Sequence, residues 1–401
     1  MDLSLFTSFT NSLSTQEAQI NQLQQQISSG LAVQTPDQNP TAYETGVLGT
    51  DIVNQLNNDN TTQAQVQTQL GSVNSAYTSM STLFDNVQSI VEQALNGTTS
   101  AANMNALAGQ VKSASQQLLS IGNTTASNGT YLFGGSRGGL TPFQANANDD
   151  IVYFGDGGNS QATIAPGQAA STIANGDVFV SSLSGDGISN VTASTSNTGS
   201  GQVLQQGVVN AATANAFQQG SSAITVGFGS GNSYTATQGG STIASGTLST
   251  SSSGTTLQLA GVDYQITGSP ANGDSFTISP ARPQSAFALL QNVYNALANA
   301  NGTPSQVAQT NQLLNQSLAG LAQYQQATLT AQAQNGVTLQ AISAASTSNT
   351  SQATEVQTNV DNATAVNTPV AIASLTQTMT ALQAAMKTFG TVQSLSLFNY
   401  L

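Results

Sequence analysis

The chain has 401 residues, of which 17 are acidic and four are basic, so its net charge is −13 and only 5% of its positions are charged. That length is enough for two or three domains with cores of their own. Nucleic acids and anionic membrane surfaces are bound through many lysines and arginines, so neither is an expected partner. The sequence has no cysteine, which excludes disulfides and thiolate metal sites.

The beginning of the chain does not read as a secretory signal peptide, which needs a basic start and an apolar core of about 7–15 residues. The first basic residue is Lys112, and polar residues interrupt every early apolar run. No stretch approaches the roughly 20 apolar residues of a membrane span. We expect no membrane insertion, and either a cytoplasmic protein or one that leaves the cell without such a peptide.

Apolar residues near the start recur at alternating steps of three and four, the heptad spacing of a coiled-coil seam. They are Phe6, Phe9, Leu13, Ile20, Leu23 and Ile27, with Gln16 as the polar member. The pattern stops at Gly30, and Pro36 and Pro40 predict a short irregular segment after it.

A second seam runs from Ile52 to Ala94 without a phase break and predicts a helix of roughly 65 Å at 1.5 Å per residue. Polar residues occupy the seam at Asp59 and Gln63. A third helix, from Met104 to Ile121, has the same spacing and is expected to form an antiparallel hairpin with the second.

Short alternating segments between Gly, Asn and Asp turns replace the helical pattern after Gly122 and predict strands. The expected strands span residues 151–154, 177–180, 223–228, 256–259, 262–267 and 275–278. Helical spacing returns with Phe287 to Leu297, continues in a long weakly apolar helix from Leu314 toward Val360, and ends in a strict seam from Ile372 to Phe389.

The predicted fold class is α+β, with a long coiled-coil-like helical domain formed by both chain ends and an inserted, mainly β domain. The expected parts are an N-terminal helical arm over residues 1–139, a surface-exposed β domain over 140–282, and a C-terminal helical arm over 283–401 that pairs with the first. Narrow apolar seams on long helices must pack on each other or on neighbouring copies. The plan therefore favours a polymer subunit over a cleft-bearing enzyme.

Four phrases of the sequence are distinctive: Gln22-Leu-Gln-Gln-Gln-Ile-Ser-Ser-Gly30, Asn128-Gly-Thr-Tyr-Leu-Phe-Gly-Gly135, Pro270-Ala-Asn-Gly-Asp-Ser-Phe-Thr-Ile278 and the ending Leu395-Ser-Leu-Phe-Asn-Tyr-Leu401. Together they resemble the hook-associated protein 3 family, FlgL, of the flagellin-like proteins. The resemblance implies a secreted structural subunit of the bacterial flagellum, exported unfolded by the flagellar type III apparatus. It places the subunit at the hook-filament junction, where both chain ends polymerise.

The partners that this resemblance implies are further copies in a ring or helical homo-oligomer, the hook-side junction protein, flagellin and a flagellar export chaperone. The expected assembly interface combines the terminal seams with the apolar ending. Its residues are Phe6, Phe9, Leu13, Ile20, Leu23, Ile27, Ile372, Leu375, Met379, Leu382, Met386, Phe389, Leu395, Leu397, Phe398, Tyr400 and Leu401.

Catalysis would have to proceed without histidine or cysteine, so we expect no enzyme, no cofactor and no metal. Asp149, Asp150 and Asp156 are interpreted as solvated turn residues, with a glycosidase pair or calcium site as the weaker alternative. Asp186 between two glycines is likewise interpreted as a turn. Gln16, Asp59 and Gln63 either specify register inside the seams or lie exposed where a seam widens.

Two other functions stay open at this point. A flagellin would explain everything but the ending, since flagellins generally lack one of the Ser-Leu-Phe-Asn-Tyr-Leu type. A secreted adhesin would explain the Ser, Thr, Gly and Asn bias of residues 180–280, but not the seams at both ends.

Overall fold

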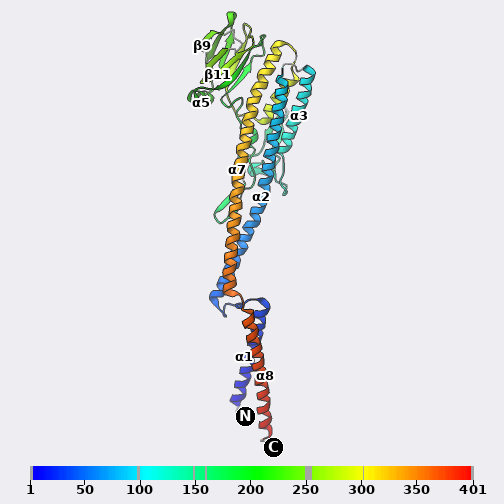
Figure 1. Cartoon of the computed structure of the whole chain (residues 1–401), viewed down its shortest axis with the longest axis vertical. Helices are drawn as coiled ribbons and strands as arrows, with labels where there is room; N and C mark the ends of the chain where they lie inside the picture. Colours follow the sequence, from blue (N-terminus) through cyan, green and yellow to red (C-terminus); the bar gives the residue numbers. More distant parts are fainter. Residues whose placement is uncertain are drawn as a thin grey trace. The chain divides into compact units, whose positions relative to one another are not determined.

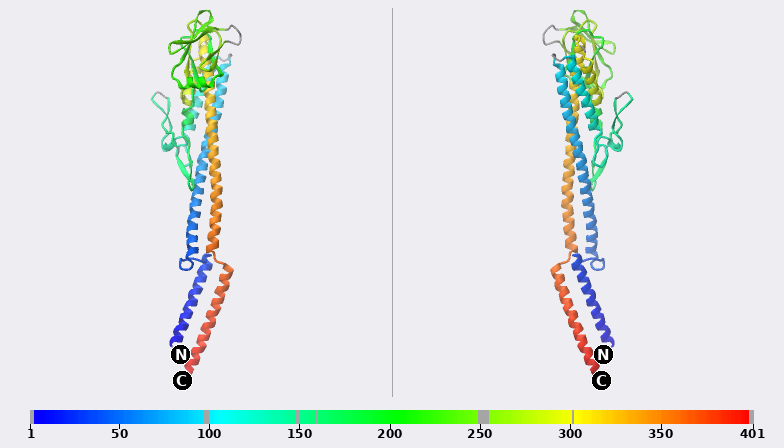
Figure 2. Two further views of the ribbon diagram at one scale, coloured as in Figure 1. Left: turned by 90° about the vertical axis from the view of Figure 1, so that its left-hand side faces the viewer. Right: turned by 90° about the vertical axis from the view of Figure 1, so that its right-hand side faces the viewer.

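The computed structural model describes residues 3–96, 100–147, 150–158, 160–248, 255–300 and 302–398. Figures 1 and 2 show the ribbon of the chain coloured along the sequence, and the chain divides into two compact units. The first unit comprises residues 1–63, 164–167 and 343–401, and the second comprises residues 64–163 and 168–342. Two long helices, α2 (Pro40–Leu95) and α7 (Pro304–Thr364), contribute residues to both units.

The first unit contains the paired chain ends. Helix α1 (Leu3–Ser29) packs along α8 (Thr368–Phe398), as Figure 1 shows, so the predicted pairing of the N- and C-terminal arms is confirmed. Helix α2 begins at Pro40, earlier than its first predicted seam residue, Ile52. Proline suits the first helical position, and the Oδ1 atom of Asn39 accepts a hydrogen bond from the N–H of Ala42 at 3.2 Å.

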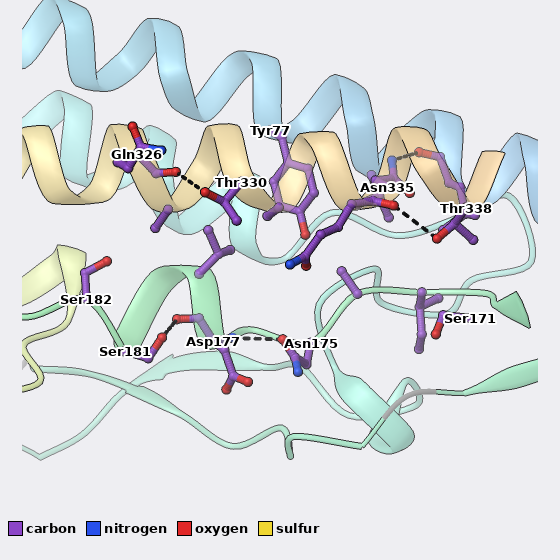
Figure 3. A pocket seen from close by; sticks show the side chains of 18 of the residues that line it. Tyr77, Ser171, Asn175, Asp177, Ser181, Ser182, Gln326, Thr330, Asn335 and Thr338 are labelled. Atoms are coloured by element: carbon purple, nitrogen blue, oxygen red, sulfur yellow. Dashed lines mark hydrogen bonds between the residues drawn. The ribbon is translucent and has the colours of Figure 1, made fainter. Parts of the chain in front are cut away.

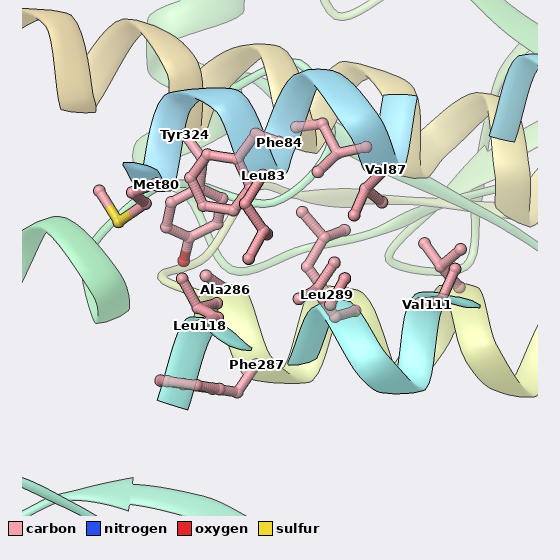
Figure 4. Packing of buried hydrophobic residues seen from close by; sticks show 14 of the residues in the cluster. Met80, Leu83, Phe84, Val87, Val111, Leu118, Ala286, Phe287, Leu289 and Tyr324 are labelled. Carbon is pink, nitrogen blue, oxygen red and sulfur yellow. The ribbon is translucent and has the colours of Figure 1, made fainter. Parts of the chain in front are cut away.

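The second unit is built on a helical core (Figure 4). Side chains from α2, α3 (Ala101–Gly122), α6 (Ala286–Ala298) and α7 meet there, and the ring of Phe84 lies 5.6 Å from that of Tyr324. Helix α3 packs against α6. The hydroxyls of Ser100 and Ser285 cap the starts of α3 and α6 by accepting backbone hydrogen bonds. Most predicted seam residues from Val73 to Val91 are buried in this core.

Several short elements follow helix α3. They are the hairpin of β1 (Phe143–Ala145) and β2 (Ile151–Tyr153), the hairpin of β3 (Gln161–Ala165) and β4 (Gln168–Ser171), and the short helices η1 (Gly135–Arg137) and α4 (Asp177–Val180). The first hairpin and α4 contribute side chains to the helical core. The predicted strand at 177–180 is therefore wrong. Val178 and Phe179 are both buried in the helical core, whereas adjacent residues of a strand would point to opposite faces.

A five-stranded antiparallel sheet forms the larger part of the β region, in the order β5-β12-β7-β8-β9. Its strands are β5 (Ser189–Ala193), β7 (Ile224–Phe228), β8 (Ser233–Gln238), β9 (Ser241–Thr247) and β12 (Ser275–Pro280), and η2 (Ser230–Asn232) precedes β8. Short alternating runs with buried residues on one face produce this sheet, as the sequence predicted for 223–228 and 275–278.

A three-stranded sheet in the order β10-β11-β6 completes the region. Its strands are β6 (Gln202–Val208), β10 (Thr255–Leu259) and β11 (Val262–Thr267), and α5 (Ala211–Gln219) follows β6. The side chains of the two sheets and of α5 form a core of their own, with buried members from Val191 to Ile278. Phe143 and Phe179, which lie inside the predicted 140–282 domain, belong instead to the helical core. The predicted domain boundaries stay a prediction.

Candidate assembly surfaces

The terminal helices α1 and α8 make an aromatic contact near the chain ends. The ring of Phe389 stacks on that of Phe9 at 4.2 Å between centroids and 6° between planes, and lies 5.9 Å from the ring of Phe6. Leu13, Ile20, Leu23 and Ile27 of α1 are half-buried along the same predicted seam. The predicted seam of α1 is thus largely used within the chain.

The predicted seam of α8 is divided between two faces. Leu375, Leu382 and Phe389 are half-buried, and the small residues Ala371, Thr378 and Ala385 accompany them. Ile372, Met379 and Met386, spaced by seven residues, are exposed, and we call them the outer stripe of α8. One partner helix covers one face of α8, so the outer stripe has no apolar cover within the described residues of this chain.

The remaining predicted interface residues lie beyond what the structure describes. The side chains of Leu395, Leu397 and Phe398, together with Tyr400 and Leu401, are outside the described part of the chain. The assembly interface as a whole therefore stays a prediction, and the outer stripe is the part of it that the structure places on a surface.

The linkers between the terminal helices and the rest of the first unit bond to each other. The N–H of Ala32 donates to the carbonyl of Thr364 at 2.7 Å, and the N–H of Val366 donates to the carbonyl of Gly30 at 2.9 Å. Gly30 has a φ of +76°, which glycine adopts without strain. This antiparallel bridge explains why the Ile-Ser-Ser-Gly phrase ends helix α1 where it does.

Helices α2 and α7 approach closely beside this bridge. A Cβ atom on Gly49 would lie 2.2 Å from the Cγ2 atom of Val360, and one on Gly46 would lie 2.9 Å from the Cγ2 atom of Thr364. Val360 and Thr364 are buried, so glycine is required for the contact. This use of the α2 surface turns Ile52 outward, and the prediction that Ile52 begins the buried seam is wrong.

The polar seam residue Gln63 is 1% exposed, which places it inside the contact rather than on a widened, exposed seam. Its side-chain N–H donates to the carbonyl of Ile164 at the tip of the β3–β4 hairpin, and Asn349 donates to the same oxygen at 3.4 Å. The buried Oε1 atoms of Gln16 and Gln63 and the Oδ2 atom of Asp59 have no hydrogen-bond partner among the described residues. A buried acceptor without a partner costs free energy, so these three positions lower the stability of the native packing.

Glutamine side chains of α7 form hydrogen bonds with the backbone of both sheets of the second unit. Gln312, which is 1% exposed, accepts from the N–H of Val203 at 2.9 Å and donates to its carbonyl at 2.8 Å. Gln316 accepts from the N–H of Val191 at 3.2 Å. Gln309 donates to Asn197 at 3.2 Å and Gln323 to Asp186 at 2.9 Å. Two sheet edges, at β6 and β5, are thereby capped by neutral amides, which the sequence analysis did not foresee because glutamine is common throughout the chain.

Asp156 and Asp186, which the sequence predicts to be turn residues, accept hydrogen bonds from nearby backbone N–H groups. The carboxylate of Asp156 accepts from the backbone and hydroxyl of Ser136 and from the N–H of Gly158, and its Oδ2 atom lies 3.7 Å from the Nε atom of Arg137. These contacts, with Ser136 first, lower the pKa of Asp156. Asp186 accepts from the N–H groups of Ile188 and Ser189 at 3.0 Å. Asp149 lies outside the described residues.

A hollow of about 630 Å³ lies between α2, α7 and the segment from Ser171 to Ser182 (Figure 3). Figure 3 shows Tyr77 and Asn335 on one side, and Asn175 and Asp177 on the other. Burial raises the pKa of the Tyr77 hydroxyl to about 12, so it stays protonated at neutral pH. The polar part of the lining consists of amides and hydroxyls around a single carboxylate, Asp177, which does not make the acid and base pair that hydrolysis needs.

Two further properties concern the described residues alone. They contain no cluster of three or more His, Cys, Asp or Glu side chains that could hold a metal ion. No helix among them is long and apolar enough to cross a membrane.

Comparison with known proteins gives a match to a sequence family and matches to solved structures. The sequence family described as the bacterial flagellin N-terminal helical region matches residues 4–137. FlgL of Xanthomonas campestris, solved in two crystal forms, is 26% identical in both. One form covers 77% of this chain and 97% of its own with a TM-score of 0.68, and the other covers 72% and 93% with a TM-score of 0.64.

The flagellar hook associated protein-3 of Legionella pneumophila has the same fold. It is 23% identical, and the match covers 79% of this chain and 98% of that chain with a TM-score of 0.71. No match was found among curated proteins.

Proposed function

We propose a structural role at the flagellar hook-filament junction for this chain, starting from the premise that it is an FlgL-like member of the flagellin family. The resemblance that its sequence phrases indicated is thereby confirmed, and so is the α+β fold. In the proposed role the chain is a secreted subunit that joins the hook-side junction protein to the flagellin filament. It forms a ring or helical homo-oligomer and has no catalytic activity.

The observation that carries the proposal is the outer stripe of α8. Helix α1 covers one face of α8 and leaves Ile372, Met379 and Met386 exposed on another. Burying a large apolar side chain stabilises an association by about 1.5–3 kcal/mol. A neighbouring subunit that covers the stripe would therefore gain from several such residues at once, in each copy of the assembly.

The export chaperone belongs to the same proposal. Apolar groups left exposed on a free subunit would cause premature association in the cytoplasm. A chaperone that covers α8 before export would prevent that association. This partner is expected from the resemblance, and the exposed stripe supports the need for it.

The test is deletion of the gene from a flagellated cell, followed by electron microscopy of the hooks and an assay of the medium for flagellin. Loss of a junction subunit should leave hooks without filaments and flagellin in the medium. Intact filaments in the deletion strain would contradict the proposal and would favour an adhesin.

Flagellin is the second candidate, because the matched family is named for the N-terminal region of flagellin. The same experiment separates the two functions. Loss of a filament subunit also removes the filaments, but it leaves the medium without flagellin.

A further inference from the structure

Three buried oxygen atoms on one turn of helix α2 have no hydrogen-bond donor in the part of the chain that the structure describes. They are Oδ2 of Asp59, Oδ1 of Asn60 and Oε1 of Gln63. Asp59 lies four residues before Gln63 and Asn60 lies three before it, and such spacings place side chains side by side on a helix, with about 5–6 Å between Cβ atoms. The three oxygens therefore belong to one face of α2, within the first unit.

The side-chain amide of Gln63 is fixed in its orientation. Its N–H donates to the carbonyl of Ile164, and Asn349 donates to the same carbonyl at 3.4 Å. A carbonyl can only accept, so the NH₂ group of Gln63 must face Ile164 and the Oε1 atom must face away from it. Gln63 is 1% exposed, so bulk solvent does not cover this oxygen.

The side-chain amide of Asn60 is fixed in the same way. Its N–H donates to the hydroxyl of Thr350 at 3.5 Å, and that hydroxyl donates its own hydrogen to the carbonyl of Ser346 at 2.8 Å. The Thr350 oxygen can therefore only accept from Asn60. A flipped amide would bring two acceptor oxygens together, so the Oδ1 atom of Asn60 also faces away from its partner.

The Asp59 carboxylate adds a negative charge to this face without a basic side chain on the same helix. Lys387, on α8, is the one lysine or arginine in the sequence of the first unit. A buried carboxylate oxygen costs free energy unless a donor or a positive charge compensates it. One water molecule donates two hydrogens, which leaves the third oxygen without a donor. A cation can be coordinated by all three oxygens at once.

We infer that Asp59, Asn60 and Gln63 bind a hard cation, with water completing its coordination shell. Ca²⁺ is the reference ion, because it takes carboxylate and side-chain amide oxygens together in a flexible geometry. The site has one acid and two amides, so it is not a cluster of acidic residues, and it departs from the sequence-based expectation of no metal. With one charged ligand the site should be weak, with a dissociation constant of about 10⁻⁴–10⁻³ M, as in extracellular calcium modules.

Thermal unfolding of the isolated full-length chain, followed by circular dichroism, tests the site. The chain is freed of metal with a chelator and kept in choline chloride, and CaCl₂ or NaCl then replaces the choline salt at constant ionic strength. We expect Ca²⁺ at about ten times its dissociation constant to raise the Tm by about 2–4 °C. An equal rise with Na⁺ would identify a monovalent ion at the same oxygens. A Tm that neither ion changes overturns the inference and leaves water as the occupant.

Asp59→Asn removes the charge, keeps the shape of the side chain and offers a donor to Gln63. We expect this variant to be more stable than the natural chain without metal and to lose the response to either ion. The matched control is Asp51→Asn, which removes the same charge from an exposed position on the same helix and should keep the response. Equal responses of the two variants would show that the ion is held by the overall negative charge, and would contradict the site.

Asn60→Asp supplies the opposite change, because it adds a second carboxylate to the site. The dissociation constant for Ca²⁺, measured by equilibrium dialysis, should fall by at least about ten-fold. Asn54→Asp, at an exposed position on the same helix, should change it little. Equal effects of the two changes contradict the site. All these measurements use the isolated subunit, so filaments that persist in the deletion strain would count against the proposed function alone.

Discussion

The side-chain amide of Gln312 takes the place of a neighbouring strand for Val203, because it bonds both the N–H and the carbonyl of that residue at 2.9 and 2.8 Å. Strand β6 is the edge of its sheet, and an unpaired edge is a site of aggregation. A neutral amide caps this edge without any charge. The arrangement suits a chain that has very few charged residues.

Replacement of Gln312 by Ala should destabilise the second unit by about 1–3 kcal/mol, because two buried main-chain groups of Val203 lose their partner. Urea unfolding measures the loss, and hydrogen exchange at the Val203 amide should accelerate. The control is Gln326→Ala, an exposed position on the same helix, with an expected change within about 0.5 kcal/mol. Equal effects of the two changes would show that Gln312 does not cap the strand.

Replacement of Gly49 by Ala should destabilise the first unit by about 1–3 kcal/mol, because the new methyl group overlaps Val360. Gly71→Ala on the same helix meets no atom within 4 Å and should instead stabilise by up to about 1 kcal/mol through helix propensity. Thermal unfolding followed by circular dichroism compares the two. A stabilised Gly49 variant would mean that α2 and α7 are not in close contact there.

The outer and inner faces of α8 should respond differently to the same change. Met379→Ser should leave the unfolding of the free subunit unchanged and reduce incorporation at the hook tip, because Met379 is exposed on the outer stripe. Leu382→Ser should destabilise the pairing of α1 with α8 in the free subunit, because Leu382 is half-buried. Export is measured for both variants by immunoblot of the medium. Normal assembly by an exported Met379→Ser chain would remove the stripe from the mechanism.

Acid should affect this fold weakly, since Arg137–Asp156 is the single ion pair among the described residues. The contact with Ser136 lowers the pKa of Asp156, so its contribution to stability is present above the unfolded value of 3.8 and is lost as the pH falls through the lower folded value. Burial raises the pKa of Asp186, so ionised Asp186 destabilises the fold, and that penalty disappears as the pH falls. The two effects oppose each other.

Circular dichroism between about pH 5 and pH 3, where carboxylates titrate, should therefore show no cooperative loss of helix. Asp186→Asn should raise the free energy of unfolding at pH 7 and have little effect at pH 3, since its amide oxygen still accepts the N–H groups of Ile188 and Ser189. A variant that is less stable at pH 7 would show that the Asp186 carboxylate stabilises the fold when ionised.

A fragment of residues 182–284 should fold by itself. It contains the whole core of the two sheets, and its ends are joined by hydrogen bonds from Ser184 to Arg282 at 2.9 Å and from Gln284 to Ser182 at 3.0 Å. A fragment of 140–282 should be less soluble, because it exposes Phe143 and Phe179. Light scattering and limited proteolysis compare the two. Equal solubility would favour the predicted boundary at residue 140.

Heptad spacing by itself was enough to predict the long helices and the pairing of the two arms, because regular apolar spacing at this length has one stable local solution and one way to be buried. Composition gave the expectations of no nucleic-acid partner and no catalysis, which stay predictions. The phrases at Gly30 and at 270–278 indicated the family. Spacing, composition and short phrases can each be read from the sequence without knowing which distant residues come into contact.

Tertiary structure alone decided which members of a seam lie inside. Spacing cannot distinguish Met379 from Leu382, since the face of α8 that is buried depends on where α1 lies. Spacing likewise made Ile52 a seam residue, although the close approach at Gly49 turns it outward, and a two-residue apolar period at 177–180 became a helical turn because both Val178 and Phe179 had a core to enter. Gln312 resembles dozens of other polar residues until a strand edge more than a hundred positions away comes within hydrogen-bond distance of it.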